Sequence, residues 1–248
     1  MKLEGKAALI TGGGTGLGRA VALQLAREGV NLAINYSRSA SDAEETAHDA
    51  SALGVKAVTL KADISVPGDA ENLVVQAAGE LGGLDLLINN AGTTKIVAFD
   101  NLDGLNEEDF LHLLKTNALS IFFASRSAAK IMKDRGGGHI INTVSIAGIR
   151  PSGSSIAYAV SKAAGIHMTK SLAVALAPLA IKVNAVAPAF LLTRWAAGFN
   201  EAWVEANKQK TLLKKIADVE ECAGMYLSIA RNDSMTGQIL AVDCGQII

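Results

Sequence analysis

A tyrosine and a lysine four residues apart could form a proton-transfer pair. Tyr158 and Lys162 lie in a stretch with helical periodicity, so the two positions share one helix face. A phenol with a pKa of about 10 is a poor acid or base at neutral pH, and a neighbouring ammonium that stabilises the phenolate lowers this pKa. Ser145 follows an apolar run and could hold a carbonyl or hydroxyl oxygen of a substrate. By themselves, Ser145 could equally cap a turn and Tyr158 could be a half-buried helix aromatic.

A glycine-rich segment near the start of the chain could bind a pyrophosphate. Residues 11–18 read TGGGTGLG and join an apolar run to an amphipathic stretch. Glycines let backbone N–H groups approach phosphate oxygens, and the start of a helix adds a partial positive charge. The strand before and the helix after the segment favour a dinucleotide loop over a simple tight turn. The expected contacts are Gly12, Thr15, Gly16, Leu17 and Gly18.

The end of the second apolar run bears on the choice between NAD and NADP. An NAD-binding chain usually carries an acidic residue about 20 positions after the glycine loop, where it binds the ribose 2′-hydroxyl. Here Tyr36, Ser37 and Arg38 occupy that region. A hydroxyl and a guanidinium suit a 2′-phosphate, which favours NADP(H). The alternative is that Arg38 is only a solvated loop cation.

These candidate residues are spaced by a regular alternation of short apolar runs and longer amphipathic stretches. The sequence predicts strands at 7–11, 30–36, 55–62, 84–90, 139–144, 181–187 and 238–242. It predicts amphipathic helices at 17–28, 41–53, 69–81, 106–134, 156–177 and 218–230. Strands joined by helical crossovers form a parallel sheet with helices on both faces, which is a doubly wound α/β fold. We expect one domain over 1–248, with the site at the carboxyl ends of the strands.

Composition and charge exclude several other classes of protein. The 248 residues are 50% hydrophobic and carry a net charge of −1, which gives no general attraction to nucleic acid or to an anionic membrane. Cys222 and Cys244 lack the neighbours that a metal knuckle or disulfide scaffold needs. The sequence shows neither a signal-peptide core nor a spanning apolar stretch. We therefore expect a cytoplasmic protein without metal, nucleic-acid or membrane partners.

Taken together and in order, the motifs resemble the short-chain dehydrogenase/reductase family, in its classical single-domain form, along essentially the whole chain. The matching features are the loop at 11–18, Asp63, Asn89-Asn90-Ala91-Gly92, Asn117, Ser145, Tyr158-x-x-x-Lys162, and Asn184 with Pro188. The resemblance implies a Rossmann fold and hydride transfer between a nicotinamide cofactor and a carbonyl or secondary alcohol. It also implies a homo-oligomer, either a tetramer or a dimer.

The resemblance implies a role for each matching position. Asp63 and Ile64 would lie toward the adenine, and Asn90, Ala91 and Gly92 near the adenosine ribose. Lys162 would bind the nicotinamide ribose, Asn117 would join it in a proton relay, and Pro188 and Thr193 would hold the nicotinamide carboxamide. From the residues alone, Asp63 could instead be a helix cap and Asn117 a helix-kinking polar residue. Ala189 stands where the family usually has glycine.

The substrate is less well defined by the sequence than the cofactor. The segments around Asn35 and Met235 resemble 3-oxoacyl-(acyl-carrier-protein) reductases, but 172–179 lacks the basic residues with which carrier-dependent members dock an acidic carrier. The stretch 189–215 is expected to cover the substrate. It contains Phe190, Trp195, Phe199 and Trp203, and we expect Phe190 and Trp195 to contact the substrate. Helix packing or a subunit contact would explain these aromatic residues equally well.

The sequence as a whole predicts an NADP(H)-dependent carbonyl reductase or alcohol dehydrogenase that acts on a small molecule. An NAD-linked sugar, polyol or steroid alcohol dehydrogenase is the alternative within the enzymes, and the lack of an acidic residue after the second strand argues against it. A catalytically silent dinucleotide-binding sensor or assembly protein is the alternative of another class. The presence of Asn117, Ser145, Tyr158 and Lys162 favours an enzyme.

Overall fold

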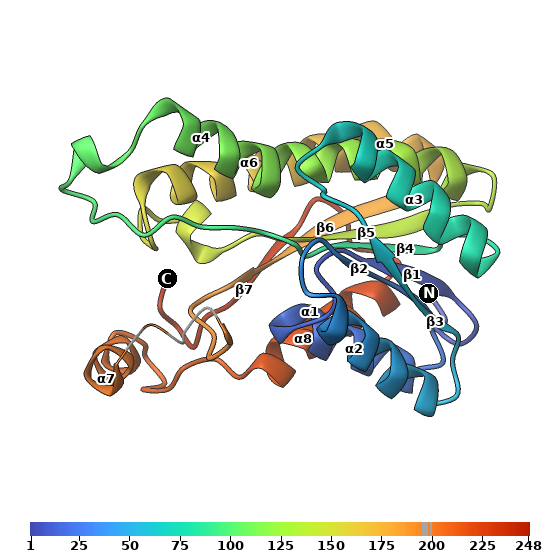
Figure 1. Cartoon of the computed structure of the whole chain (residues 1–248), viewed down its shortest axis with the longest axis horizontal. Helices are drawn as coiled ribbons and strands as arrows, with labels where there is room; N and C mark the ends of the chain where they lie inside the picture. The colour runs from blue at the N-terminus through green and yellow to red at the C-terminus, as the bar shows by residue number, and fades with distance from the viewer. Residues whose placement is uncertain (195–197, 199) are drawn as a thin grey trace.

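A single parallel sheet of seven strands forms the centre of the molecule (Figure 1). The structure is a computed structural model that describes residues 1–194, 198 and 200–248. Its strands are β1 (Ala7–Ile10), β2 (Asn31–Tyr36), β3 (Ala57–Lys61), β4 (Leu86–Asn89), β5 (Gly138–Thr143), β6 (Ile181–Pro188) and β7 (Ile239–Val242). They lie in the order β3-β2-β1-β4-β5-β6-β7, and each registered pair is parallel. The predicted doubly wound α/β fold is confirmed.

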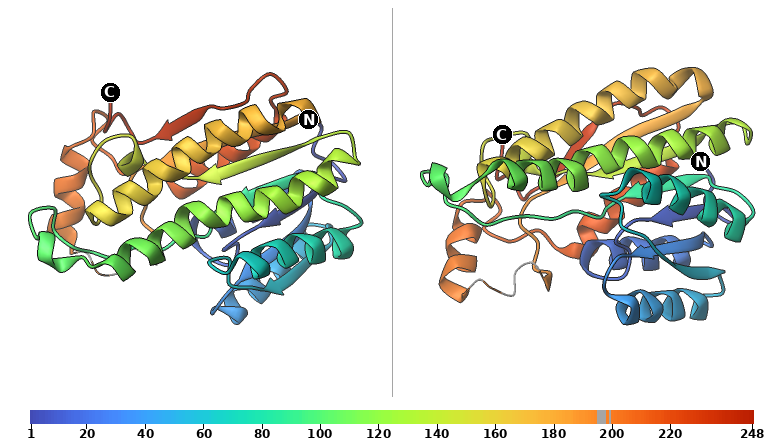
Figure 2. Two further views of the ribbon diagram at one scale, coloured as in Figure 1. Left: turned by 90° about the horizontal axis from the view of Figure 1, so that it is seen from above. Right: turned by 45° about the horizontal axis from the view of Figure 1, so that its top comes forward.

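Helices cover both faces of this sheet (Figures 1 and 2). One layer contains α1 (Gly16–Arg27), α2 (Ala40–Ala52) and α8 (Val219–Arg231). The other contains α3 (Pro67–Leu81), α4 (Glu107–Leu114), α5 (Ser120–Lys133) and α6 (Ile156–Leu176). The short helix α7 (Glu201–Gln209) lies apart from both layers, near the end of the chain.

The strand sequences explain why the sheet is covered on both sides. Every residue of β1 and β4 is buried, as expected when neither face of a strand meets water. Successive side chains point to opposite faces, so Ile10 and Ile88 pack in the core on the α1 and α8 side. Leu9 and Leu87 pack in the core on the α3 and α5 side. The two apolar layers fix the register of the strands that carry the site.

One helical prediction differs from the structure. The stretch 106–134 is divided into α4 and α5 by a π-helical turn at Lys115–Leu119, which places Asn117 at an irregular point of the backbone. Within the stretch 189–215, which is expected to cover the substrate, the described residues form the helix α7, and Trp195 and Phe199 lie outside the described residues.

The crossovers bring the polar segments of the chain to one edge of the sheet. After β3, the chain returns through α3 to β4, which pairs with β1 on the side opposite β2. The glycine loop and the ends of β2, β4, β5 and β6 consequently share the carboxyl edge. In an open α/β sheet, the point where the winding reverses is where ligands bind.

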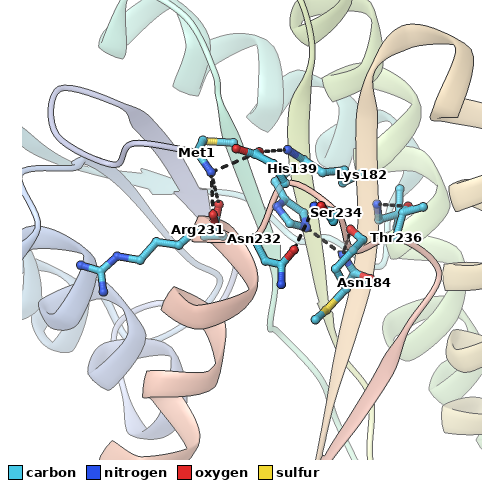
Figure 3. Close-up of polar contacts among 12 residues, drawn as sticks. Met1, His139, Lys182, Asn184, Arg231, Asn232, Ser234 and Thr236 are labelled. Atoms are coloured by element: carbon cyan, nitrogen blue, oxygen red, sulfur yellow. Dashed lines mark hydrogen bonds and ion pairs between the residues drawn. The ribbon is translucent and has the colours of Figure 1, made fainter.

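The opposite edge contains a buried histidine held by its neighbours (Figure 3). The side-chain nitrogen of Asn184 on β6 lies 2.8 Å from Nε2 of His139 on β5, and it also donates to the Met235 carbonyl oxygen. Because Asn184 is the donor, Nε2 of His139 accepts and the ring is neutral. Burial lowers the pKa of His139 to about 3. A nearby ion pair joins Lys182 to Asp233.

Two kinds of feature are absent from the described part of the chain. Among these residues, none of the helices combines the length and apolar character that crossing a bilayer requires. The same residues contain no group of three or more histidine, cysteine or acidic side chains placed to hold a metal ion.

Candidate active site

Tyr158 and Lys162 lie one helical turn apart near the start of α6. The Ser155 hydroxyl caps this helix by accepting from the backbone N–H of Tyr158 at 3.2 Å. The Lys162 ammonium lies 5.7 Å from the centroid of the Tyr158 ring and donates to the Thr143 carbonyl oxygen at 3.1 Å. The two side chains thus lie together at the carboxyl end of β5, as their spacing predicts.

Ser145 follows β5 and begins a short 3₁₀ turn at Ile146–Gly148. Its Oγ accepts from the Ala147 N–H at 3.2 Å and lies 3.4 Å from the Pro188 carbonyl oxygen. Its hydroxyl also interacts with the Tyr158 hydroxyl. Ser145 is therefore a turn cap that also lies beside Tyr158, and its contact with a substrate oxygen stays a prediction. A Cβ on Gly148 would lie 2.6 Å from the Lys162 carbonyl carbon, so glycine lets this turn pack directly on α6.

Burial shifts the pKa values of the pair in opposite directions. It raises the pKa of Tyr158 to about 12, and the hydrogen bond with Ser145 only partly opposes this. It lowers the pKa of Lys162 to about 8. The pKa of Tyr158 is thus raised and not lowered as expected, because desolvation of the phenolate is the largest effect on it. At neutral pH, Tyr158 is therefore protonated and Lys162 is mostly charged.

Asn117 is buried in the π-helical turn and its side-chain amide joins three segments. Its Oδ1 accepts from the Thr93 N–H, and its Nδ2 donates to the Thr93 carbonyl and to Ser161 Oγ, each at 2.9 Å. Ser161 in turn donates to the Tyr158 carbonyl at 2.7 Å. These bonds fix α6 against the loop after β4. The proton relay with Lys162 stays a prediction.

The loop between β1 and α1 has the tight geometry that its glycines allow. Gly12 and Gly16 adopt φ values of 61° and 52°, in the left-handed region that favours glycine. A Cβ on Gly18 would lie 2.3 Å from the Gly12 carbonyl oxygen and 2.6 Å from Asn90 Nδ2, so a larger residue would force this packing apart. Helix α1 begins within the loop, and its N-terminus is suited to a phosphate.

Asn90 fastens the glycine loop to the end of β4. Its Nδ2 donates to the carbonyl oxygens of Thr11 and Gly12, both at 3.1 Å. Thr11 Oγ1 accepts from the N–H groups of Asn90 and Ala91 at 2.9 and 3.0 Å. A Cβ on Gly92 would lie 3.1 Å from Asn117 Oδ1 and 3.4 Å from Lys162 Nζ. The motif therefore connects the glycine loop with the Tyr158 and Lys162 pair.

The residues expected near the adenosine lie at the ends of β2 and β3. Tyr36 is half-buried, whereas Ser37 and Arg38 are exposed just before α2. Asp63 Oδ1 accepts from the N–H and the hydroxyl of Ser65 at 3.0 and 2.7 Å, and these bonds lower the pKa of Asp63. The charge of Arg38 lowers it further. Asp63 thus stabilises a local turn, while Ile64 is buried beside it.

The segment after β6 reaches back to the glycine loop and to α2. A Cβ on Gly16 would lie 3.4 Å from Thr193 Cβ. Arg194 forms a bidentate ion pair with Asp42 at the start of α2, with N–O distances of 2.7 and 2.5 Å. Phe190 packs edge-to-face on Trp203 with a centroid distance of 4.8 Å. That contact agrees with the packing interpretation for these two aromatics, while Trp195 lies outside the described residues.

Several residues that organise the site were not identified from the sequence. These are Thr93, Ser161, Thr143, Asp42, Arg194 and Tyr226, each of which bonds to an expected site residue or braces a segment that carries one. They are separated from their partners by up to 152 residues, as in the Arg194 and Asp42 pair. Local periodicity therefore carried no signal for them.

Comparisons with known proteins agree with this geometry. The family model described as short chain dehydrogenase matches residues 6–203. A Streptomyces violaceoruber protein whose name describes a ketoacyl reductase of the granaticin polyketide synthase is 37% identical over 98% of this chain and 96% of its own length. The 3-oxoacyl-[acyl-carrier-protein] reductase FabG of Staphylococcus epidermidis is 31% identical over 97% of this chain and 98% of its own length.

A solved structure gives the same result in three dimensions. The short chain dehydrogenase of Burkholderia cenocepacia, in complex with NADP, superposes with a TM-score of 0.91 at 33% identity, and 99% of each chain is covered. The same group of enzymes is indicated by the glycine loop, by the tyrosine and lysine pair, by the strand order of the sheet and by the sequence similarity. The chain belongs to the short-chain dehydrogenase/reductase family, whose members bind a nicotinamide dinucleotide.

Proposed function

We propose that this protein is an NADP(H)-dependent carbonyl reductase or secondary alcohol dehydrogenase. The observation that carries the proposal is the meeting of Ser145, Tyr158 and Lys162 at the sheet edge where the glycine loop lies. A nicotinamide bound at this edge supplies or accepts the hydride. The alternative of a silent dinucleotide-binding protein is disfavoured, because the groups for proton transfer stand together.

The chain's own groups divide the remaining work. The Ser145 hydroxyl holds the substrate oxygen, and Tyr158 donates the proton from its phenol when a carbonyl is reduced. Lys162 holds a positive charge beside Tyr158 and, with Asn117, replaces the proton that Tyr158 gives up. Because the pKa of Tyr158 is about 12, the phenol carries its proton at neutral pH, which is the form that carbonyl reduction requires.

Preference for NADP(H) over NAD(H) is proposed from the end of β2. Ser37 and Arg38 are exposed there, where a 2′-phosphate could accept charge-assisted hydrogen bonds from them. The Burkholderia cenocepacia relative was solved with NADP, which supports the same choice. The proposed cofactor contacts are Gly12, Thr15, Gly16, Leu17, Gly18, Tyr36, Ser37, Arg38, Asp63, Ile64, Asn90, Ala91, Gly92, Tyr158, Lys162, Pro188 and Thr193.

The proposed substrate is a small carbonyl compound of the 3-oxoacyl type. The names of the Streptomyces and Staphylococcus relatives support this chemistry. The absence of basic residues at 172–179, at the end of α6, favours a free small molecule over a carrier protein. We further propose one catalytic domain over 1–248, in which 189–215 covers the substrate. A cytoplasmic homo-oligomer is the proposed form.

One experiment tests both cofactor and reaction. Purified protein is titrated with NADPH and with NADH, and binding is measured by nicotinamide fluorescence. A panel of ketones and 3-oxoacyl thioesters is then assayed with the cofactor that has the lower Kd. We expect selective NADPH binding and turnover of a member of the panel. Tight binding without turnover would favour the silent sensor, and a preference for NADH would overturn the assignment of Arg38.

A further inference from the structure

A tyrosine outside the proposed site reaches its centre from the opposite helical layer. Tyr226 lies on α8, in the same layer as α1 and α2, and its side chain is fully buried. Its hydroxyl oxygen lies 2.7 Å from Thr143 Oγ1 at the end of β5, although 83 residues separate them in the chain. The carbonyl group of the same Thr143 accepts the bond from Lys162. A single residue, Thr143, therefore links Tyr226 to the lysine of the proposed proton-transfer pair.

The direction of the hydrogen bonds follows from their partners. Asn90 uses its side-chain nitrogen to donate to the Thr11 and Gly12 carbonyls, which turns its oxygen toward Thr143. The Thr143 hydroxyl donates to this oxygen at 3.4 Å. A hydroxyl carries one proton, so Thr143 must accept from Tyr226. The chain runs from Tyr226 through Thr143 to Asn90, and ends on two carbonyl groups at the glycine loop.

We infer that the hydroxyl of Tyr226 is a positioning group that orients Asn90, and through it the dinucleotide loop, from helix α8. This inference rests on the proposed function, because it assigns the loop at 11–18 to cofactor binding. Thr143, the middle member of this series of hydrogen bonds, also accepts from Lys162 through its backbone carbonyl, so it lies between the two proposed cofactor-binding elements, Lys162 and the glycine loop. A single buried phenol thereby sets the relative position of both.

Packing alone does not explain a tyrosine at this position. A phenylalanine would fill nearly the same volume without bringing a polar group into the core, where an unsatisfied hydroxyl is costly. Burial raises the pKa of Tyr226 far above its usual value, so the phenol stays a neutral donor at every working pH. The hydroxyl is therefore a permanent source of one hydrogen bond, and that bond goes to Thr143.

The test removes the hydroxyl and keeps the ring. Tyr226→Phe should raise the Kd for NADPH roughly five- to tenfold, which is the effect of one lost buried hydrogen bond. The Kd is measured by nicotinamide fluorescence with both NADPH and NADH. The substrate KM at saturating cofactor should stay within about twofold, because the proposed substrate contacts do not include the hydrogen-bonded residues Tyr226, Thr143 and Asn90. A general loosening of the structure would raise both constants.

A second variant tests whether Tyr226 acts through Thr143. Thr143→Val removes the receiving hydroxyl and should weaken dinucleotide binding by a similar factor. The double variant should bind no more weakly than Thr143→Val alone, because the chain is already interrupted. Thr169→Val is the matched control. It also removes a buried hydroxyl, which accepts a hydrogen bond from Asn142, the neighbour of Thr143 on β5, but it takes no part in the hydrogen bonds that link Tyr226, Thr143 and Asn90. This control should lower the Tm and leave the dinucleotide Kd within about twofold.

The outcomes separate this inference from the proposed function. If the unaltered protein binds a dinucleotide and Tyr226→Phe changes its Kd by less than about twofold, the positioning role is wrong and the proposed function stands. Additive effects of the two substitutions would also overturn it. If the unaltered protein binds neither NADPH nor NADH, the proposed function and this inference both fail.

Discussion

The ammonium of Lys162 faces the ring of Tyr158 rather than a carboxylate, with 5.7 Å between Nζ and the ring centroid. At this distance the ring face attracts the cation, while burial lowers the pKa of Lys162 to about 8. The phenol itself has its pKa raised to about 12 by burial. At neutral pH a protonated Tyr158 therefore lies beside a mostly charged Lys162, and this arrangement has measurable consequences.

Replacing Tyr158 by phenylalanine should remove catalysis without removing the cofactor. Tyr158→Phe keeps the ring that Lys162 faces but loses the transferable proton, so we expect kcat to fall roughly 10²- to 10⁴-fold. The Kd for NADPH, measured by fluorescence titration, should change by no more than about twofold. Substantial remaining turnover would exclude Tyr158 as the proton donor.

The rate of carbonyl reduction should decline on the alkaline side. Lys162 loses its charge as the pH rises through about 8, whereas Tyr158 stays protonated up to about 12. We therefore expect kcat/KM for reduction to be level near neutral pH and to fall above pH of about 8, because the charged lysine is the required form. Initial rates with NADPH across this range provide the measurement. A level profile well into the alkaline range would show that the charge of Lys162 is not required.

Lys162 should reduce stability while it supports catalysis. Lys162→Met replaces a buried ammonium with an apolar side chain of similar length, so we expect the free energy of unfolding at neutral pH to rise by roughly 1 to 3 kcal/mol. The gain should shrink as the pH rises from about 8 toward 10.5, the ordinary pKa of lysine, because the folded lysine is already neutral and the unfolded lysine becomes progressively easier to deprotonate. Urea unfolding at several pH values tests this, together with an assay that should show lost activity. A less stable Lys162→Met protein would contradict the prediction.

Arg38 should discriminate between the two dinucleotides. Arg38→Ala removes a guanidinium from the proposed 2′-phosphate site, so the Kd for NADPH should rise roughly tenfold and the Kd for NADH should hardly change. Arg27→Ala provides a matched control, because Arg27 is an exposed arginine at the end of α1. Equal weakening of both dinucleotides by Arg38→Ala would refute the assignment.

His139 should make the fold sensitive to acid. Burial lowers its pKa from an ordinary value of 6.5 to about 3. Between these two pH values, His139 is protonated in the unfolded chain and neutral in the folded protein. Stability should fall as the pH decreases below about 6.5, with a contribution of up to about 1.4 kcal/mol per pH unit from this residue. His139→Gln should flatten the slope seen in urea unfolding, whereas His48→Gln, at an exposed position of α2, should keep it. An unchanged slope in His139→Gln would exclude this source of acid sensitivity.

The sequence by itself was sufficient for the parts of the protein that depend on local pattern. Apolar runs such as 84–90 predicted the strands, because a strand buried on both faces needs nearly continuous apolar residues. The glycines at 11–18 predicted a tight turn into a helix, and the spacing of Tyr158 and Lys162 placed both on one face of α6. These inferences hold because the period of a helix or strand is a property of a few consecutive residues.

Only the tertiary structure decided the properties that depend on residues far apart in the chain. The sequence suggested that Lys162 lowers the pKa of Tyr158, but packing buries Lys162 and half-buries Tyr158, and desolvation then raises the phenol pKa to about 12. The contacts of Tyr226 with Thr143 and of Arg194 with Asp42 join segments that only the crossovers of the sheet bring together. Burial and long-range hydrogen bonds arise when the whole sheet closes, so no local spacing could have shown them.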